Sequence, residues 1–191
     1  MANQSSTGFG LRPLRKVGQN DDNAGLSEWK KATGSAAINH HELVQLLSTG
    51  YVLSAAAGGP SLLGSLNGSF YTAPTTLKPT WSNYAPSIVA SDHTCLINDD
   101  PYQMYEMMTA LTNYTDPAAA GATADIVATA GSGAPNYISG FTLGTQATAA
   151  DVQMKIIGLT RDTLSQDVSV AGSVWRCMVN ESILGSNSLG I

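Results

Sequence analysis

The stretch V-W-R-C-M-V-N-E, residues 174–181, is the clearest strand in the sequence. Trp175 and Cys177 fall on one face of an extended chain and Arg176 on the other, because successive side chains of a strand point to opposite faces. A strand with one apolar face lies on a core, which makes Trp175 a core residue. Residues 152–159 (V-Q-M-K-I-I-G-L) form a second strand of similar clarity.

Further short apolar runs are separated by turn residues. They predict strands at residues 51–53, 75–82, 88–90, 94–98, 102–107 and near 137–143. Residues 36–47 combine helical and alternating spacing, and we interpret them as a strand with a short turn of helix. About eight short strands without a long helix indicate a mainly β protein, a single β-sandwich or β-barrel domain.

Two local motifs concern turns. Asn67-Gly68 lies between apolar runs in L-L-G-S-L-N-G-S-F-Y-T, residues 62–72. This pair is a strong signal for a hairpin, although it also fits a bulge within one continuous strand. Asp99-Asp100-Pro101 predicts a turn, because Pro presets its backbone angle and Asp side chains bond nearby backbone. Residues 109–150 are rich in Ala, Gly and Thr and predict long loops, with a short turn at 125–128.

Composition narrows the function classes. The chain has 191 residues, of which 12% are charged and 43% hydrophobic, and its net charge is −5. Soluble domains typically carry about 25% charged residues, so this surface consists of hydroxyls and amides more than ions. Such a surface suits permanent contact with neighbours, because association then desolvates few charges. We expect neither broad nucleic-acid contact nor a membrane span, since the uncharged stretches 43–77 and 126–150 are interrupted by Gly, Pro, Asn and Thr.

The first 25 residues differ from the rest of the chain. Their frequent Gly and Pro exclude a helix, so residues 1–25 predict an extended arm, ordered by docking on a partner, and residues 26–191 a β-rich body. A tail that is disordered in the isolated chain is the alternative. Residues 1–31 carry a net charge of +2 and residues 32–191 one of −7. Seven arm residues are expected to contact the partner: Phe9, Leu11, Arg12, Leu14, Arg15, Lys16 and Val17.

Residue types that catalysis or metal binding would need are sparse. Ser91, Asp92 and His93 match the types of a hydrolytic triad, but neighbours in a strand point to opposite faces and cannot form that relay. The pair His40-His41 would need further ligands to hold a metal. No nucleotide-binding or calcium-loop motif is present. We therefore expect no enzyme activity, no cofactor and no metal.

Two cysteines and two aromatic residues deserve separate interpretations. Cys95 and Cys177 lie in apolar strands, where small buried thiols are more common than a single disulfide. Trp81 lies in a Pro-rich segment and is a candidate for contact with a neighbouring subunit, together with Tyr84.

Five segments of the chain resemble small structural proteins of tailed bacteriophages, many of them from marine hosts. Each segment is short, none is a catalytic signature, and together they run along most of the chain. They are G-F-G-L-R-P-L-R-K-V-G (8–18), N-A-G leading into S-E-W (23–29), G-S-L-N-G-S-F-Y (64–71), N-D-D-P-Y-Q-M-Y-E (98–106) and V-W-R-C-M-V-N-E (174–181).

The resemblance implies a capsid decoration protein, also called a cement protein. Such proteins bind the outside of the icosahedral shell, bridge neighbouring subunits of the major capsid protein and resist the pressure of packed DNA. They are typically small β domains, often trimeric, with an N-terminal arm that runs over the shell. For this chain the resemblance implies a location on the outer surface of the virion and a homo-oligomer, with a trimer favoured. Deleting residues 2–25 is then expected to abolish shell binding and to leave the body folded.

Two other functions stay open at this point. Another virion part, above all a tail-tube subunit, would also be small and rich in strands, and it would assemble into stacked rings. A surface carbohydrate-binding module is the second alternative, with Trp81, Tyr84 and Tyr71 as its aromatic platform.

Overall fold

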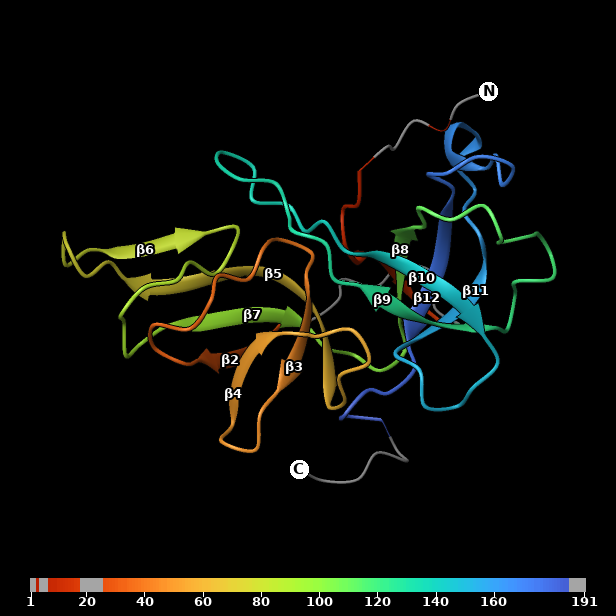
Figure 1. Cartoon of the computed structure of the whole chain (residues 1–191). Coiled ribbons are helices and arrows are strands. Elements are labelled where there is room, and N and C mark those ends of the chain that lie inside the picture. Colours follow the sequence, from red (N-terminus) through yellow and green to blue (C-terminus); the bar gives the residue numbers. More distant parts are fainter. Residues whose placement is uncertain (1–2, 4–6, 18–25, 186–191) are drawn as a thin grey trace.

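The regular secondary structure of the described residues consists almost entirely of β-strands (Figure 1). The computed structural model describes residues 3, 7–17 and 26–185. This part of the chain contains twelve strands and one 3₁₀ turn (Thr163–Ser165). The first six strands are β1 (Arg12–Lys16), β2 (Ser27–Lys31), β3 (Leu43–Leu46), β4 (Tyr51–Ser54), β5 (Leu62–Thr72) and β6 (Pro79–Ser82). The others are β7 (Thr94–Asn98), β8 (Gln103–Met108), β9 (Thr123–Val127), β10 (Thr142–Ala147), β11 (Met154–Leu159) and β12 (Val174–Val179).

One sheet has the strand order β3-β4-β2-β7-β5-β6, and β3 also pairs with β5. This extra pairing closes β3, β4, β2, β7 and β5 into what we call the first ring. Strand β5 is long enough to pair with β3 through its first half and with β6 through its second half. In Figure 1 the β5–β6 pair extends away from the rest of the molecule.

The other sheet has the order β1-β8-β12-β11-β9-β10. A parallel bridge between Thr109, just after β8, and Leu143 of β10 brings its ends together. Strands β8 to β12 therefore form a second ring, and β1 adds to the outer edge of β8. In Figure 1 the first ring lies on the left and the second on the right.

Both rings have the same connectivity. The first strand of each ring, β2 or β8, runs antiparallel to the fifth, β7 or β12. The fifth strand pairs with the fourth, the fourth with the second, and the second with the third, all antiparallel. The third strand then meets the first in parallel.

Two clusters of buried apolar side chains hold the sheets together. One cluster fills the first ring with Ile38, Val44, Val52, Leu63, Leu66, Ala85, Cys95 and Ile97. The larger one fills the second ring around Trp175 and Tyr105, and it also takes in Leu43 and Leu62 from the first ring. Because one core contains residues of both sheets, the two sheets pack as a sandwich-like unit. This confirms the predicted mainly β fold and the core position of Trp175, which is fully buried.

The strongest strand predictions are confirmed. Residues 94–98 form β7, residues 174–179 form β12 and residues 154–159 form β11. The hairpin at Asn67-Gly68 is wrong, because residues 62–72 are one strand whose register with β7 shifts between Leu66 and Gly68. The alternative of a bulge within one strand is therefore confirmed.

Two segments differ from their predictions. Residues 88–90 form no strand; Val89 is 74% exposed, and the carbonyl of Ile88 accepts a hydrogen bond from Gly34 at 2.8 Å. The predicted turn at 125–128 is wrong, because residues 123–127 form β9. Its alternation is weak in sequence, but Ala124 and Ile126 enter the larger core.

The N-terminal segment lies between the two rings. The Leu11 amide donates to the His41 carbonyl at 2.7 Å, and the Leu11 carbonyl accepts from Ser65 Oγ at 2.7 Å, both in the first ring. The Gly10 amide donates to the Phe141 carbonyl, next to β10 of the second ring, at 3.2 Å. The fully buried Leu11 side chain belongs to the larger core.

This placement differs from the predicted arm. Residues 7–17 lie on the body, and residues 12–16 are a strand of its second sheet. Pro13 has no backbone N–H to donate and therefore suits an edge strand, which is what β1 is. The remainder of the predicted arm at 18–25 lies outside the described residues. Deleting residues 2–25 would remove β1 and Leu11, so we expect this deletion to destabilise the body as well.

The first prediction tests how closely this segment approaches the first ring. Gly10 has φ +72°, and a Cβ placed there would lie 2.1 Å from the His41 carbonyl oxygen. Gly50 has φ +79° with nothing within 4 Å of its Cβ position. Gly50→Ala should lower the free energy of unfolding by about 1–2 kcal/mol from its backbone angle alone. Gly10→Ala should cost about 2–4 kcal/mol, because overpacking is added.

Urea unfolding of the two variants checks this difference. Equal losses would show that the chain near Gly10 yields without cost, and they would contradict the tight contact with His41.

Candidate interaction surface

A row of cross-strand neighbours runs over the solvent-facing side of the first ring. It passes from β4 to β6 through residues that pair directly in the sheet: Tyr51, Lys30, Thr94, Phe70 and Trp81. The Lys30 ammonium donates to Thr94 Oγ1 at 3.0 Å, as expected for side chains on the same face. Three aromatic residues of this row are exposed: Tyr51 by 43%, Phe70 by 47% and Trp81 by 52%. We call these five residues the aromatic row.

The bulge in β5 creates the aromatic end of the row. Gly68 lies beneath the Trp81 indole, because a Cβ on Gly68 would be 2.4 Å from Cη2 of that ring. Phe70 follows two residues later on the same face and pairs with Trp81. The indole therefore lies on a glycine platform beside a phenyl ring, with half of its surface in water.

Sequence reasoning identified Trp81 but missed Tyr51, Lys30 and Phe70. A signal was available for Phe70: once Asn67-Gly68 is taken as a bulge, the residue two places further on shares the face of Gly68. The contributions of β2 and β4 could not be found in this way, because they depend on which strands pair.

Tyr84 and Tyr71 lie elsewhere. The Tyr84 ring stacks on Tyr137 with centroids 3.7 Å apart and an angle of 9°. Tyr71 lies on the opposite face of β5 from Phe70 and is not part of the aromatic row. Its ring packs against His93, with centroids 5.1 Å apart. The three-residue platform of Trp81, Tyr84 and Tyr71 is therefore not assembled.

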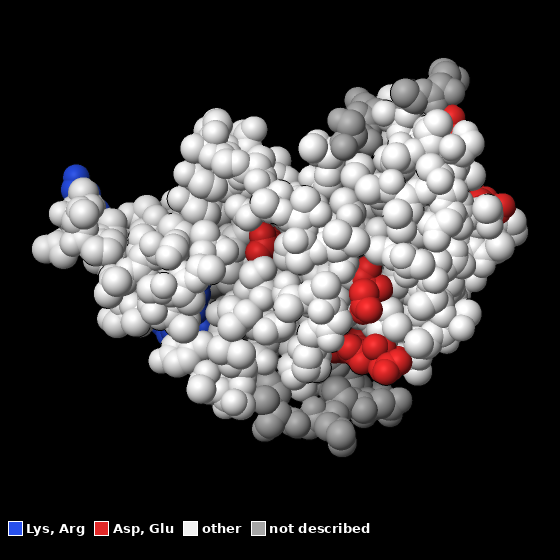
Figure 2. All heavy atoms as spheres, in the orientation of Figure 1, with Lys and Arg blue, Asp and Glu red and all other residues white. Residues whose placement is uncertain are grey.

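Charges are sparse and unevenly placed. Most of the face drawn in Figure 2 carries no ionic group, and its acidic side chains gather mainly on the right, where Figure 1 places the second ring. Partial burial, and then the neighbouring Asp151 and Asp125 carboxylates, raise the pKa of Glu181. The aromatic row contains one charged residue, Lys30, and Glu28 is exposed on the adjacent row of β2.

The seven predicted arm contacts have separate environments. Leu11 is buried in the body, and Phe9 and Leu14 are half-buried. Arg12 forms an ion pair with Glu106 and lies 5.1 Å from the centroid of the Phe9 ring. Lys16 pairs with Asp100 at 2.9 Å. The exposed members of the set are Arg12, Arg15 and Val17.

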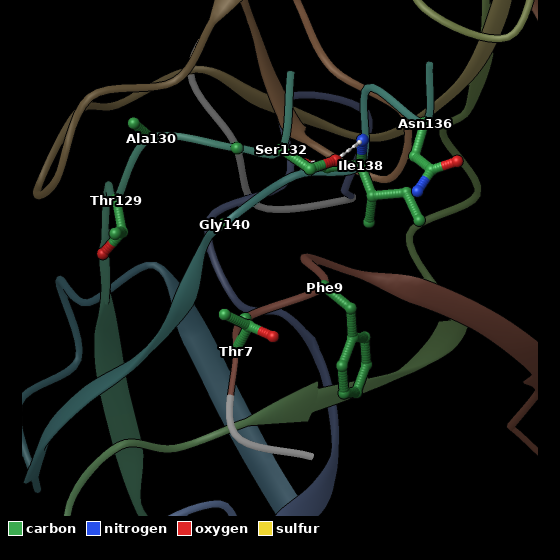
Figure 3. A pocket seen from close by; sticks show the side chains of 10 residues that line it. Thr7, Phe9, Thr129, Ala130, Ser132, Asn136, Ile138 and Gly140 are labelled. Atoms are coloured by element: carbon green, nitrogen blue, oxygen red, sulfur yellow. Dashed lines mark hydrogen bonds between the residues drawn. The ribbon is translucent and has the colours of Figure 1, made fainter. Parts of the chain in front are cut away.

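A cavity of about 470 Å³ lies where the N-terminal segment meets the loop before β10. Figure 3 shows Thr7 and Phe9 on one side and residues of the loop 129–140 on the other. The Ile138 amide donates to Ser132 Oγ at 2.8 Å within that loop. None of the ten lining residues has an acidic or basic side chain, so the cavity provides hydroxyl, amide and apolar contacts.

The buried thiols are neutral at physiological pH. Cys95 and Cys177 are both free and buried, as expected from their apolar strands. Burial raises the pKa of Cys95 to about 12 and raises that of Cys177 further. Neither side chain is therefore a thiolate nucleophile.

The histidine of the triad-like sequence is isolated from its neighbours. His93 is fully buried, and neither of its ring nitrogens has a hydrogen-bond partner in the part of the chain that the structure describes. Asp92 instead accepts a hydrogen bond from the Thr72 amide at 3.0 Å. Burial, and then the nearby Lys31 charge, lower the pKa of His93 to about 4.

Within the described residues no group of three or more His, Cys, Asp and Glu side chains is placed to hold a metal ion. No helix in the same residues has the length and apolar character needed to cross a bilayer.

Comparisons with known proteins add no family. A scan against protein-family models finds no match, and searches of curated proteins and of solved structures find none either.

The second prediction concerns acid stability. Burial lowers the pKa of His41 as well as that of His93 to about 4, against about 6.5 in an unfolded chain. Between these values the unfolded state binds more protons, so stability falls as the pH falls from about 6.5 to about 4. His93→Leu removes one of the two groups together with its unpartnered nitrogens. The variant should therefore lose less stability than the wild type when the pH is lowered.

Melting temperatures of the wild type and His93→Leu between pH 7.5 and 4 check the prediction. At pH 7.5 the variant should be as stable as the wild type or more so, because buried polar atoms without partners are costly. Parallel pH profiles for the two proteins would contradict it.

Proposed function

We propose that this chain is a structural protein of a phage virion, which binds the outer surface of the capsid and bridges subunits of the major capsid protein. The observation that carries the proposal is the aromatic row on a molecule with only 12% charged residues. The five segments that resemble phage structural proteins give the row its context. One of them, residues 64–71, contains both Gly68 and Phe70.

The physics of the aromatic row supports a protein interface. Exposed Trp and Tyr dominate binding energy at interfaces, because they bury large areas at a small cost in conformational entropy. Trp81 and Phe70 lie side by side on a rigid sheet, so little ordering is needed when a partner covers them. Few charges surround them, which keeps the desolvation cost of a permanent contact low.

Residues of the N-terminal segment extend the proposed contact. Arg15 and Val17 are exposed on or next to edge strand β1. In this proposal they contact the shell from the body, and Leu11 keeps the segment in place. The number of copies on a capsid then multiplies a modest interface into strong overall binding.

The proposal includes self-association, with a trimer favoured. Trp81, on the extended β5–β6 pair, is the residue proposed to reach a neighbouring copy. Tyr84 supports that pair from the body through its stacking on Tyr137.

The third prediction tests capsid binding. Purified chain is added to isolated expanded capsids that lack it, and saturation, imaging and capsid melting are measured. The wild type should bind at lattice positions and raise the melting temperature of the capsid. Trp81→Ala should weaken binding at least about tenfold, because loss of this aromatic contact between neighbouring copies removes the avidity of the lattice.

Leu164→Ala is the matched control. Leu164 is 60% exposed but lies in the 3₁₀ turn of the other ring, so its truncation should leave binding unchanged. Both substitutions remove exposed side chains, and equal melting temperatures of the isolated proteins verify their folding. Absence of binding by the wild type, with rings or tubes forming instead, would assign the chain to the tail and refute the proposal.

A further inference from the structure

The two rings match residue by residue, beyond their shared strand order. In the first ring Leu66 accepts from the His41 amide at 2.8 Å and donates to the Glu42 carbonyl at 3.0 Å. In the second ring the Ile156 carbonyl accepts from the Gly121 amide at 2.9 Å, and the Ile156 amide donates to the Ala122 carbonyl at 2.8 Å. His41 and Gly121 both have positive φ, 63° and 88°. The same turn therefore leads into the second strand of each ring.

The bulges also coincide. In the first ring the strand register changes between Leu66 and Gly68, and in the second ring it changes between Ile156 and Gly158. Each change lies where the fourth strand pairs with the fifth. The Lys31 amide donates to the carbonyl of His93 at 3.0 Å, just before β7. The Thr109 amide likewise donates to the carbonyl of Ser173 at 2.9 Å, just before β12.

A repeat is visible in the sequence as well. Asn-Asp-Asp occurs at 20–22 and again at 98–100, and a Glu follows at the same distance, as Glu28 and Glu106. Both the Asn-Asp-Asp motif and the Glu recur at a spacing of 78 residues. Strand pairing agrees with this alignment, because Glu28 faces Leu96 of β7 while Glu106 faces Arg176 of β12. The chain therefore consists of two copies of one five-stranded unit.

The two copies differ at one edge. In the second ring, β1 lies antiparallel along the first half of β8, and Arg12 pairs with Glu106 both in register and as an ion pair. In the first ring, β4 meets β2 only at Lys30 and Lys31. No strand of the described residues lies along Ser27–Trp29 on that side, and the Glu28 side chain is exposed.

We infer that this edge of β2 is a docking site for an extended segment of a partner protein that carries a basic residue opposite Glu28. The second ring shows the geometry: an added antiparallel strand whose arginine meets the equivalent glutamate. An unpaired strand edge offers main-chain donors and acceptors that an added strand satisfies. The inference goes beyond the proposed function and does not depend on a capsid.

Surrounding charges favour a single basic residue at this position. Lys30, two residues from Glu28 on the same face, is hydrogen-bonded to Thr94 and limits the local negative charge. Asp99 is turned to the other face, where it accepts from Ser27 Oγ at 2.8 Å and from Trp29 Nε1 at 2.9 Å. Glu28 is thus the carboxylate available to a strand at this edge, as Glu106 is at the edge of β8.

The probe is a synthetic peptide of the chain's own residues 9–17, F-G-L-R-P-L-R-K-V, labelled for fluorescence anisotropy. It supplies the strand that the second ring already holds, so it should bind the intact protein at the first ring. Hydrogen exchange with the peptide bound should show new protection of the Glu28 amide, which points away from β7 because the amides of Ser27 and Trp29 face that strand. Glu28→Gln should weaken peptide binding about two- to fivefold, the usual range for one exposed ion pair.

Two controls separate strand addition from attraction between net charges. Asp151→Asn removes an equal charge from an exposed site before β11, and it should leave peptide affinity unchanged. Of two peptides methylated on alternate backbone amides, one should lose binding to the wild-type protein, since only one edge of an added strand pairs.

Three results would overturn the inference. One is the absence of peptide binding to the wild-type protein. Another is peptide binding without new protection at Glu28, the result expected if the peptide only replaces β1 on β8. The third is equal weakening by Glu28→Gln and Asp151→Asn, which would reduce the interaction to net charge.

Discussion

The close approach of the N-terminal segment to both rings is the constraint on which the rest of the structure depends. A side chain at Gly8 would place its Cβ 2.2 Å from the Gly140 carbonyl oxygen, and one at Gly10 would meet His41. With only hydrogens at these positions, the backbone bonds the first ring through Leu11 and the second through Gly10. Leu11 then fills the core that the two rings share. The composition of the N-terminus predicts an extended arm, but its residues 8–11 join the two rings. We call residues 8–11 the seam.

This seam explains how two equivalent five-stranded units acquire different surfaces. The second ring holds β1 on the edge of β8, where Glu106 is covered by Arg12. Among the described residues no strand covers the corresponding edge of the first ring, which carries the exposed Glu28 and the aromatic row around Phe70 and Trp81. The unit that lacks an internal cover is thus the one with the features expected of an interface. Both the proposed function and the proposed docking edge use that asymmetry.

Polar groups inside the molecule link the two rings. The Gln153 amide donates to the carbonyls of Ala56 and Gly59 in the first ring, at 2.8 and 3.0 Å, while its oxygen accepts from Ile126 in the second. The Tyr105 hydroxyl donates to the Asn98 carbonyl at 2.7 Å. Such buried hydrogen bonds fix how two sheets pack, because an unmade bond at these positions would be costly.

Alternation of side chains was sufficient to predict the strands at 94–98 and 174–179, the buried thiols and the mainly β fold, because burial of one sheet face imposes a period of two on the sequence itself. Local pattern also contained the bulge at Gly68 and the repeat of Asn-Asp-Asp, although the bulge competed with a hairpin of the same sequence. Strand partners, the seam at Gly10 and the aromatic row were decided by the folded chain. They arise from contacts between residues far apart in sequence, such as Tyr51 beside Lys30 and Phe70 beside Trp81, and no local period encodes which distant strand supplies the neighbour.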